Sequence, residues 1–317
     1  MPQSETRVDA AFTKEDFTYV EQELLTVPKE ELIVREIIQP DPTPVPGHHV
    51  EYRWYGSQGE TALLAAGSKA KDLPTVNMKG GRDTAPMFRI VNIIELDQTD
   101  REAIQYARAK GLPVPDEAFQ YSEAARQHAE DEQKLFFTGA ADFNKKGILN
   151  YAGINSENAS TGVIGATDTE KRLAANKTSK ELLKDFARML QLSSNGGIFK
   201  KFTFVGPSNL EETLLTMPYN DTSETTMLEF LKDKLKSKVD RWFFTNAVAA
   251  GNNGLAVDSC LLFEASRRVI KYRVPQDVVM LPAIYDVLQS MQQAVVTKTS
   301  GCILLQEKAV TRIDGLS

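Results

Sequence analysis

The longest uninterrupted helical pattern in the chain runs from residue 115 to residue 139, PDEAFQYSEAARQHAEDEQKLFFTG. Pro115 suits a first helical turn, because its missing N–H would have no partner there. Gly139 can adopt the left-handed conformation that ends a helix. One helix face carries small and polar side chains until it reaches Leu135 and Phe136. At ~1.5 Å per residue the helix is roughly 30 Å long. The pattern predicts a strut lying across a sheet rather than a helix buried in a globular core.

The overall composition excludes several classes of protein. The 317 residues are 42% hydrophobic and 25% charged, ordinary values for one large globular domain or two smaller ones. A net charge of −6 argues against direct, non-specific binding of nucleic acid. Cys260 and Cys302 are too few for a disulfide framework, and their apolar strand contexts are typical of inert core thiols. A reduced, cytosolic environment is the simplest interpretation.

No segment carries the pattern of a targeting or membrane sequence. The first residues, MPQSETRVDAAFTKEDF, lack the basic segment and apolar run of a signal peptide. No apolar run approaches the ~20 residues that a membrane span needs. We therefore expect no membrane partner.

The N-terminal segments favour packing on neighbours over a compact core. Residues 13–27 predict a short amphipathic helix, with Phe17 and Leu24 on its apolar face, that must dock on something to be stable. Residues 31–38, ELIVREII, are a strand candidate, and four prolines in 40–46 favour an extended backbone. The first 47 residues therefore read as an arm.

A projecting hairpin is predicted next. Residues 48–55 and 86–96 have strand composition, and a long polar, glycine-containing segment at 56–84 joins them. Such a connection is unusual inside a compact domain and is typical of a functional or intermolecular loop. A disordered surface loop is the alternative.

The remainder of the chain mixes helices and strands without strict βαβ alternation, which favours an α+β fold. A short helix is expected at 97–110, and Ser179 is expected to cap an amphipathic helix with Leu182, Phe186 and Met189 on its buried face. Further helices are expected at 223–237, at 284–292 and at 209–217, the last with its leucines inward: Leu210, Leu214 and Leu215. Strands are expected at 200–206, 239–248, 259–265, 269–274, 277–283 and 301–310.

Motifs that carry chemistry are scarce. There is no phosphate-binding loop, no nucleophile elbow and no pair of carboxylates that could be named as acid and base. Among the three histidines, His128 lies four residues before Glu132, a helical spacing that can chelate a metal. No second histidine pair supports that site, so a solvated or paired helix face is the preferred interpretation. We predict no catalytic residue, no cofactor and no metal site.

Several strings, in order, resemble one known fold. They are AGSKAKDLPTVNMKGG with APMFRIVNIIELDQTDREAI, EAARQHAEDEQKLFFTG with GILNYAGIN, FTFVGPSNLEETLLTM, and DVVMLPAIYDVLQSMQQAVVTKTSGCILLQEKAV. Together they are similar to the shell fold of Hong Kong ninety-seven type, shared by tailed-phage major capsid proteins and encapsulins. The resemblance spans roughly residues 24–313.

The resemblance implies a division of the chain. Residues 1–47 would be an N-terminal arm and residues 48–96 an extended-loop hairpin. Residues 97–147 would be a peripheral domain whose spine helix is 115–139. Residues 148–294 would form an axial domain, and residues 295–317 would return to the peripheral domain.

The resemblance also implies a function. The chain would be a major capsid protein of a tailed bacteriophage that assembles with itself into pentamers, hexamers and a closed icosahedral shell. That shell would enclose double-stranded DNA, contacted non-specifically, and would meet portal, scaffold and decoration proteins. The location would be the virion, assembled in the host bacterial cytoplasm. Inter-subunit contacts are expected at Phe17, Leu24, Trp54, Lys69, Lys71, Lys79 and Arg82.

Some members of the fold crosslink a lysine of the extended loop to a neighbour's asparagine. For Lys69, Lys71 and Lys79, solvated lysines are the preferred interpretation. A second hypothesis for the function is an encapsulin-like compartment that holds a cargo enzyme. The long, proline-rich arm and the lack of an identifiable cargo pocket favour the virus capsid. A third hypothesis is a metal-dependent enzyme that uses His128 and Glu132.

Overall fold

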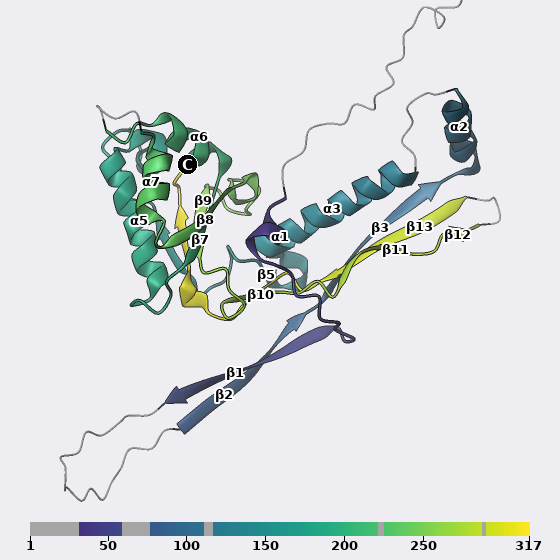
Figure 1. The fold of residues 1–317 in the computed structure, drawn as a ribbon, viewed down its shortest axis with the longest axis horizontal. Helices are drawn as coiled ribbons and strands as arrows, with labels where there is room; N and C mark the ends of the chain where they lie inside the picture. The colour runs from purple at the N-terminus through teal and green to yellow at the C-terminus, as the bar shows by residue number, and fades with distance from the viewer. Residues whose placement is uncertain (1–31, 59–76, 111–116, 221–224, 287–289) are drawn as a thin grey trace, which may run out of the picture. The chain divides into compact units, whose positions relative to one another are not determined.

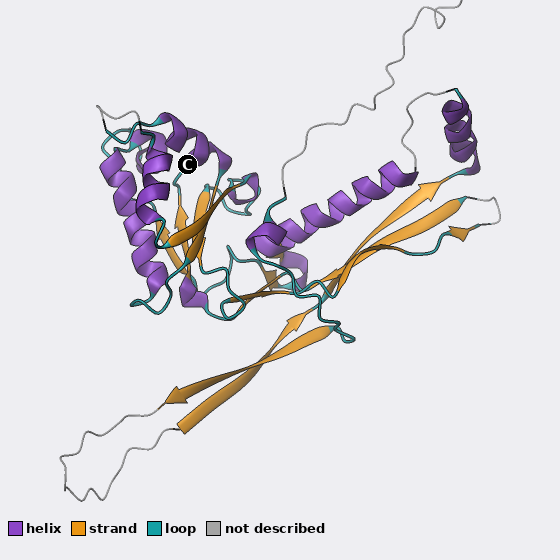
Figure 2. Cartoon of the chain, viewed as in Figure 1, coloured by secondary structure: helices purple, strands orange, loops and turns teal. Residues whose placement is uncertain are grey.

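A computed structural model of the chain describes residues 32–58, 77–110, 117–220, 225–286 and 290–317. Helices and strands are mixed in order, which confirms the α+β class (Figures 1 and 2). The described chain packs as two units. One contains Asn92–Ala125 and Met280–Val295, and the other contains Glu30–Val91, Arg126–Val279 and Val296–Ser317.

The projecting hairpin is present, but its second strand is not the predicted one. β1 (His49–Gln58) pairs antiparallel with β2 (Asn77–Pro86), from His49 opposite Pro86 to Gln58 opposite Asn77. Most of β2 lies in the predicted loop 56–84. A two-stranded ribbon with little burial needs no apolar alternation, so a search for hydrophobic periodicity misses it.

The predicted strand 86–96 is instead β3 (Phe88–Leu96), which pairs with β13 (Met291–Thr299). β11 (Gln276–Met280) and β12 (Ile284–Tyr285) complete this four-stranded sheet. The helix predicted at 284–292 is wrong, because β12 and the first residues of β13 occupy its described part. Short apolar runs do not distinguish strand from helix by spacing alone. α2 (Gln98–Ala109) confirms the predicted helix at 97–110.

The long strut is α3 (Glu117–Phe137), and it ends as predicted. Phe136 and Phe137 are fully buried at its C-terminal end. Gly139 has φ +84°, and a Cβ placed there would lie 2.2 Å from the carbonyl oxygen of Lys145. Only glycine fits this close antiparallel approach of β4 (Gly139–Ala140) to β5 (Lys145–Lys146). Residues 115 and 116 lie outside the described residues.

The larger core surrounds a five-stranded sheet in the order β6-β15-β9-β7-β8. Its strands are β6 (Asn155–Asn158), β15 (Val310–Asp314), β9 (Ser259–Phe263), β7 (Phe202–Gly206) and β8 (Val239–Phe244). Every residue of β7 and β9 is buried, as in a sheet covered on both faces. Its helices are α4 (Asp168–Arg172), α5 (Ser179–Ser194), α6 (Ser208–Thr216) and α7 (Met227–Leu235). Figure 2 shows α5, α6 and α7 packed around the strands.

The last strand, β15, lies between β6 and β9 in this sheet. Residues 295–317 therefore contribute strands to more than one sheet. Within the same range, β14 (Cys302–Leu304) pairs with β10 (Ile270–Tyr272) in a separate two-stranded sheet. Val310 and Ile313 of β15 are both buried. A strand pairs where its apolar side chains can pack against those of the neighbouring strands, and these two residues do so here.

The amphipathic helix α5 confirms most of its predicted features. Thr178, one residue before the predicted Ser179, is the N-cap and forms a capping box with Glu181. Leu182, Phe186 and Met189 are buried as expected. On α6 the expectation fails at Leu215, which is 48% exposed.

One part of the predicted arm, residues 33–38, packs into the hydrophobic core. Residues 31–38 were predicted as a strand, but the chain forms a short helix there, α1 (Val34–Ile37). Ile33, Val34, Ile37 and Ile38 are all buried in the main hydrophobic cluster. These apolar residues share one face of a helix, whereas in a strand they would lie on both sides, as in a strand covered on both faces. Tertiary packing selects the helix.

Candidate assembly surface

The predicted contact residues that the structure describes are three of the seven, and all three lie on the hairpin. Phe17, Leu24, Lys69 and Lys71 lie outside the described residues. The backbones of Trp54 and Lys79 lie on β1 and β2, opposite Gly81 and Gly56 respectively. Arg82 is exposed on β2 and lies directly opposite Arg53 on β1.

The Arg53–Arg82 pair places two positive charges opposite each other on the ribbon. Like charges directly opposite on paired strands destabilise the pairing. Arg53 Nε donates to Glu51 Oε1 at 3.0 Å, which offsets one of the two charges. Among the residues described, no carboxylate lies within ion-pair distance of Arg82. The ribbon therefore presents a cation to whatever covers it.

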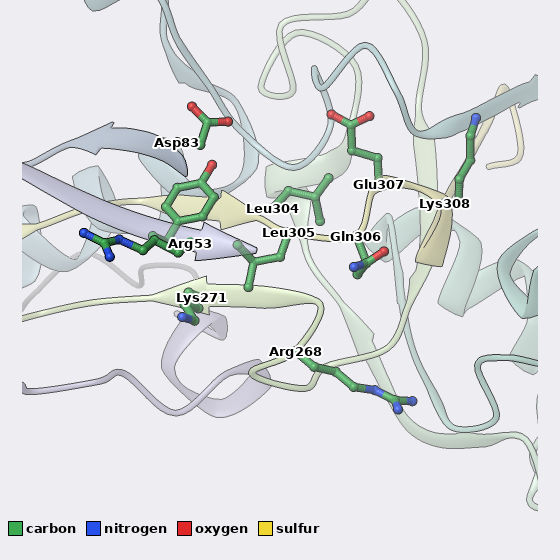
Figure 3. Close-up of a pocket in the computed structure, with 10 residues that line it drawn as sticks. Arg53, Asp83, Arg268, Lys271, Leu304, Leu305, Gln306, Glu307 and Lys308 are labelled. Atoms are coloured by element: carbon green, nitrogen blue, oxygen red, sulfur yellow. The ribbon is translucent and has the colours of Figure 1, made fainter. Parts of the chain in front are cut away.

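The base of the hairpin lies beside residues 304–308, and Lys298 of β13 holds the chain that leads into it. A groove of about 550 Å³ is lined by hairpin residues on one side and by the segment 304–308 on the other (Figure 3). Burial raises the pKa of Tyr52, and the nearby carboxylate of Asp83 adds to that shift through charge and a hydrogen bond. Lys298 Nζ donates to the carbonyl oxygens of Val45 at 2.6 Å and Gly47 at 3.0 Å, and so fixes the chain where it enters β1.

A network around the buried Glu132 carboxylate holds α1 against α3. Arg35 donates from Nε to Glu132 Oε2 at 3.1 Å and from Nη2 to Glu132 Oε1 at 3.2 Å. Tyr272 Oη donates to Glu132 Oε2 at 2.8 Å, and Glu132 is only 2% exposed. Arg35 also pairs with the more exposed Asp277 at 2.8 Å. Ile33 N donates to Gln133 Oε1 at 3.0 Å, so the two segments meet at adjacent helix positions.

The charges within this network shift pKa values in consistent directions. The hydrogen bond to Asp277, with the charge of Glu132, raises the pKa of Arg35. The same bond from Arg35 lowers the pKa of Asp277. Burial raises the pKa of Tyr272, and the Glu132 carboxylate raises it further. Arg35, Tyr272 and Asp277 have no sequence signal, because their separations from each other and from Glu132 follow no motif.

His128 makes a separate contact and is not solvated. It is fully buried, and its Nδ1 lies 2.7 Å from Thr297 Oγ1 on β13. Its Nε2 has no hydrogen-bond partner among the described residues. Burial lowers the pKa of His128, and the Asp131 carboxylate partly opposes that shift.

His128 and Glu132 therefore belong to two different packing contacts. The preferred interpretation is a solvated or paired helix face. Both side chains are buried and each has a hydrogen-bond partner, so the face is paired and not solvated. No cluster of three or more potential metal ligands exists within the described ranges. The geometry gives no support to the metal-enzyme hypothesis.

Both cysteines are free and fully buried, as predicted for core thiols. Burial raises the pKa of Cys302 to about 12 and that of Cys260 well above its usual range. No described helix is both long and apolar enough to cross a membrane.

Comparisons with solved structures find chains of similar fold in phages and in a virus-like particle. The capsid of Myoviridae phage XM1 aligns with a TM-score of 0.77 and 14% identity, over 97% of this chain and 100% of that one. Mycobacterium phage Bobi gives a TM-score of 0.61 and 11% identity, over 97% and 99%. The virus-like particle from Pyrococcus furiosus gives 0.53 and 14%, over 88% and 91%. At these identities the likeness establishes the fold.

Among curated protein sequences, none matches this chain. The sequence model of the major capsid protein family, however, matches residues 61–316. That range covers most of the chain, including the hairpin strand β2, the long helix α3 and the five-stranded sheet. The chain belongs to the major capsid protein family and is a structural protein of a viral shell.

Proposed function

We propose that copies of this chain assemble into pentamers and hexamers, and that these close into the icosahedral shell of a tailed phage around double-stranded DNA. The observation that carries the proposal is the β1–β2 ribbon. It is a two-stranded sheet that no third strand joins within the described residues. An isolated ribbon of this kind is marginally stable in water, so a neighbouring copy would supply the surface that covers it.

The charge on the ribbon supports a contact with a second copy. Arg82 is exposed and makes no ion pair with a described carboxylate, whereas the chain as a whole carries a net charge of −6. An acidic surface of a neighbouring copy would therefore complement this cation. Trp54, Lys69, Lys71 and Lys79 stay predicted contacts of the same loop, and Phe17 and Leu24 stay predicted contacts of the arm.

The proposed division of labour follows the expected segments. The arm would be residues 1–47, the extended loop 48–96, the peripheral domain 97–147 with a return at 295–317, and the axial domain 148–294. The position of β15 supports moving residues 310–314 to the axial part. Packaged DNA would be confined rather than gripped, because a net acidic shell attracts few phosphates. We further propose that the protein has no catalytic activity. Portal, scaffold and decoration proteins would be its other partners, and assembly would take place in the host cytoplasm.

Two matched truncations test the role of the ribbon. Because Arg53 lies opposite Arg82, an Asn-Gly turn joining these two residues removes 54–81 and leaves the hairpin base intact. A second variant joins Gln58 to Asn77 by the same turn and retains the whole paired ladder. Circular dichroism would establish that each variant folds, and light scattering with electron microscopy would measure particle formation.

We expect the variant lacking 54–81 to fold as a subunit and to form no shells. Shells from the Gln58–Asn77 variant alone would assign the contact to the paired ribbon, and shells from neither would assign it to the loop beyond. Closed particles of normal size from both variants would refute the proposal. A protein cargo in place of DNA inside natural particles would select the compartment hypothesis.

A further inference from the structure

The chain contains two Asn-Gly dipeptides, Asn195–Gly196 and Asn253–Gly254. The asparagine of the first is exposed, and that of the second is fully buried. In such a dipeptide the backbone nitrogen of glycine can attack the asparagine Cγ. Ammonia then leaves and a five-membered succinimide forms. Water opens that ring at either carbonyl and yields aspartate or isoaspartate, with no change of oxidation state. Glycine favours the attack because it has no side chain to obstruct it.

Asn195 is in a position to react. It is the exposed C-cap of α5, with φ +40° in the left-handed region. Its side-chain amide makes no hydrogen bond to any described residue, and the same holds for the N–H of Gly196. A Cβ built on Gly196 or Gly197 would meet nothing within 4 Å, so this turn has open space around it.

Asn253 is held in place and is fully buried. Its Nδ2 donates to the carbonyl oxygens of Val248 at 2.8 Å and Val257 at 2.9 Å, and lies 3.4 Å from Ser259 Oγ. Its Oδ1 accepts from Leu255 N at 2.7 Å. The amide must leave all of these partners before a succinimide can form, which requires local unfolding.

We infer that Asn195 is a site of spontaneous deamidation in the folded protein and that Asn253 is protected from it. The consequence falls on the C-terminal end of α5. A new carboxylate there faces the negative end of the helix dipole. Isoaspartate would also insert an extra backbone carbon into the turn in which Gly197 N donates to Ser194 O at 2.9 Å.

The affected turn is one that ties α5 to the large sheet. Ser193 Oγ is bonded to Leu262 O at 3.2 Å and to Thr311 Oγ1 at 2.8 Å. Asn155 Nδ2 donates to Leu192 O at 3.2 Å. Deamidation at Asn195 would therefore loosen the last turn of α5 on β9 and β15, and this does not depend on the proposed shell assembly.

The two sites provide an internal control for the test. Purified protein would be incubated in mildly alkaline buffer, both folded and in urea, and each Asn-Gly peptide would be analysed by mass spectrometry with fragmentation that distinguishes isoaspartate. In the folded protein we expect Asn195 to react at least about tenfold faster than Asn253, because opening the Asn253 cluster breaks several hydrogen bonds. In urea the two rates should be similar.

Asn195→Gly removes the reactive amide and suits the left-handed C-cap. We expect this variant to fold and to stop forming the acidic species seen on isoelectric focusing of aged protein. Asn195→Asp, which mimics one product, should lower the unfolding temperature. Equal rates at both sites in the folded protein, or the same acidic species from Asn195→Gly, would overturn the inference.

Discussion

Glu132 is the carboxylate on which the contact between α1 and α3 depends, and replacing it with glutamine tests that role. Glu132 Oε2 accepts from both Arg35 Nε and Tyr272 Oη, and Oε1 accepts from Arg35 Nη2. Glutamine keeps the shape but turns one of these acceptors into an NH₂ donor facing another donor. At least one buried hydrogen bond is therefore lost together with the charge.

The size of the effect follows from burial. Breaking a fully buried ion pair costs about 3–5 kcal/mol, and a hydrogen bond to a charged group contributes about 1.5–3 kcal/mol. Arg35 is 38% exposed and keeps Asp277 as a partner, which places the cost near the lower values. We expect Glu132→Gln to lower the free energy of unfolding by about 2 kcal/mol, which corresponds to a shift of roughly 5 °C in unfolding temperature.

Glu130 is a matched control that lies two residues before Glu132 on the same helix. It is 47% exposed and pairs with Arg126 four residues earlier on the same helix, a kind of pair that contributes about 0.3–0.5 kcal/mol. Thermal unfolding would compare Glu130→Gln, Glu132→Gln, Tyr272→Phe and the Glu132–Tyr272 double variant. A loss at Glu132 no larger than that at Glu130, or strict additivity with Tyr272→Phe, would refute the account of a coupled network.

Two further predictions concern buried titratable groups. Because burial lowers the pKa of His128 in the folded state, the unfolded chain binds a proton first, so stability falls as the pH drops below the ordinary value of about 6.5. Chemical denaturation between about pH 5 and pH 7 should show this dependence of the unfolding free energy on pH. His128→Gln, which can still bond Thr297, should make that dependence weaker. An unchanged pH dependence in the variant would contradict the assignment. Cys260 and Cys302 should resist maleimide in the native protein and react fully in denaturant, and labelling before unfolding would contradict their burial.

Long elements with a strong local signal could be predicted from the sequence. The strut, its glycine stop and the amphipathic face of α5 each depend on residues within a few turns of one another, and each is confirmed. The main error in these regions is Leu215, which has helical spacing but lies on the exposed side. Spacing defines a face, whereas only the packing of neighbours determines how far that face is covered.

The contacts that hold the chain together across long distances could not be predicted. Arg35 meets Glu132 and Asp277 across separations of 97 and 242 residues, and no local pattern records such pairs. The same limit explains α1. Four apolar residues at 33–38 predict burial correctly, but their surroundings decide between helix and strand. His128 and Glu132 have the i, i+4 spacing of one helix face. In the fold, however, His128 contacts Thr297 and Glu132 accepts from Tyr272, so the two side chains have different partners.

The β1–β2 ribbon is the part of the surface that the described subunit explains least. Of its residues with described side chains only Val50 and Ala85 are buried, and both lie near its base. When a strand has a buried face, its hydrophobic pattern fixes the pairing register, and this ribbon has almost no such face. Its ten-residue ladder also places Arg53 opposite Arg82, which opposes the pairing. A contact with another copy would stabilise a ribbon that has little packing of its own and like charges opposite each other. Arg82→Glu should therefore impair assembly, while the stability of the subunit stays unchanged or rises slightly.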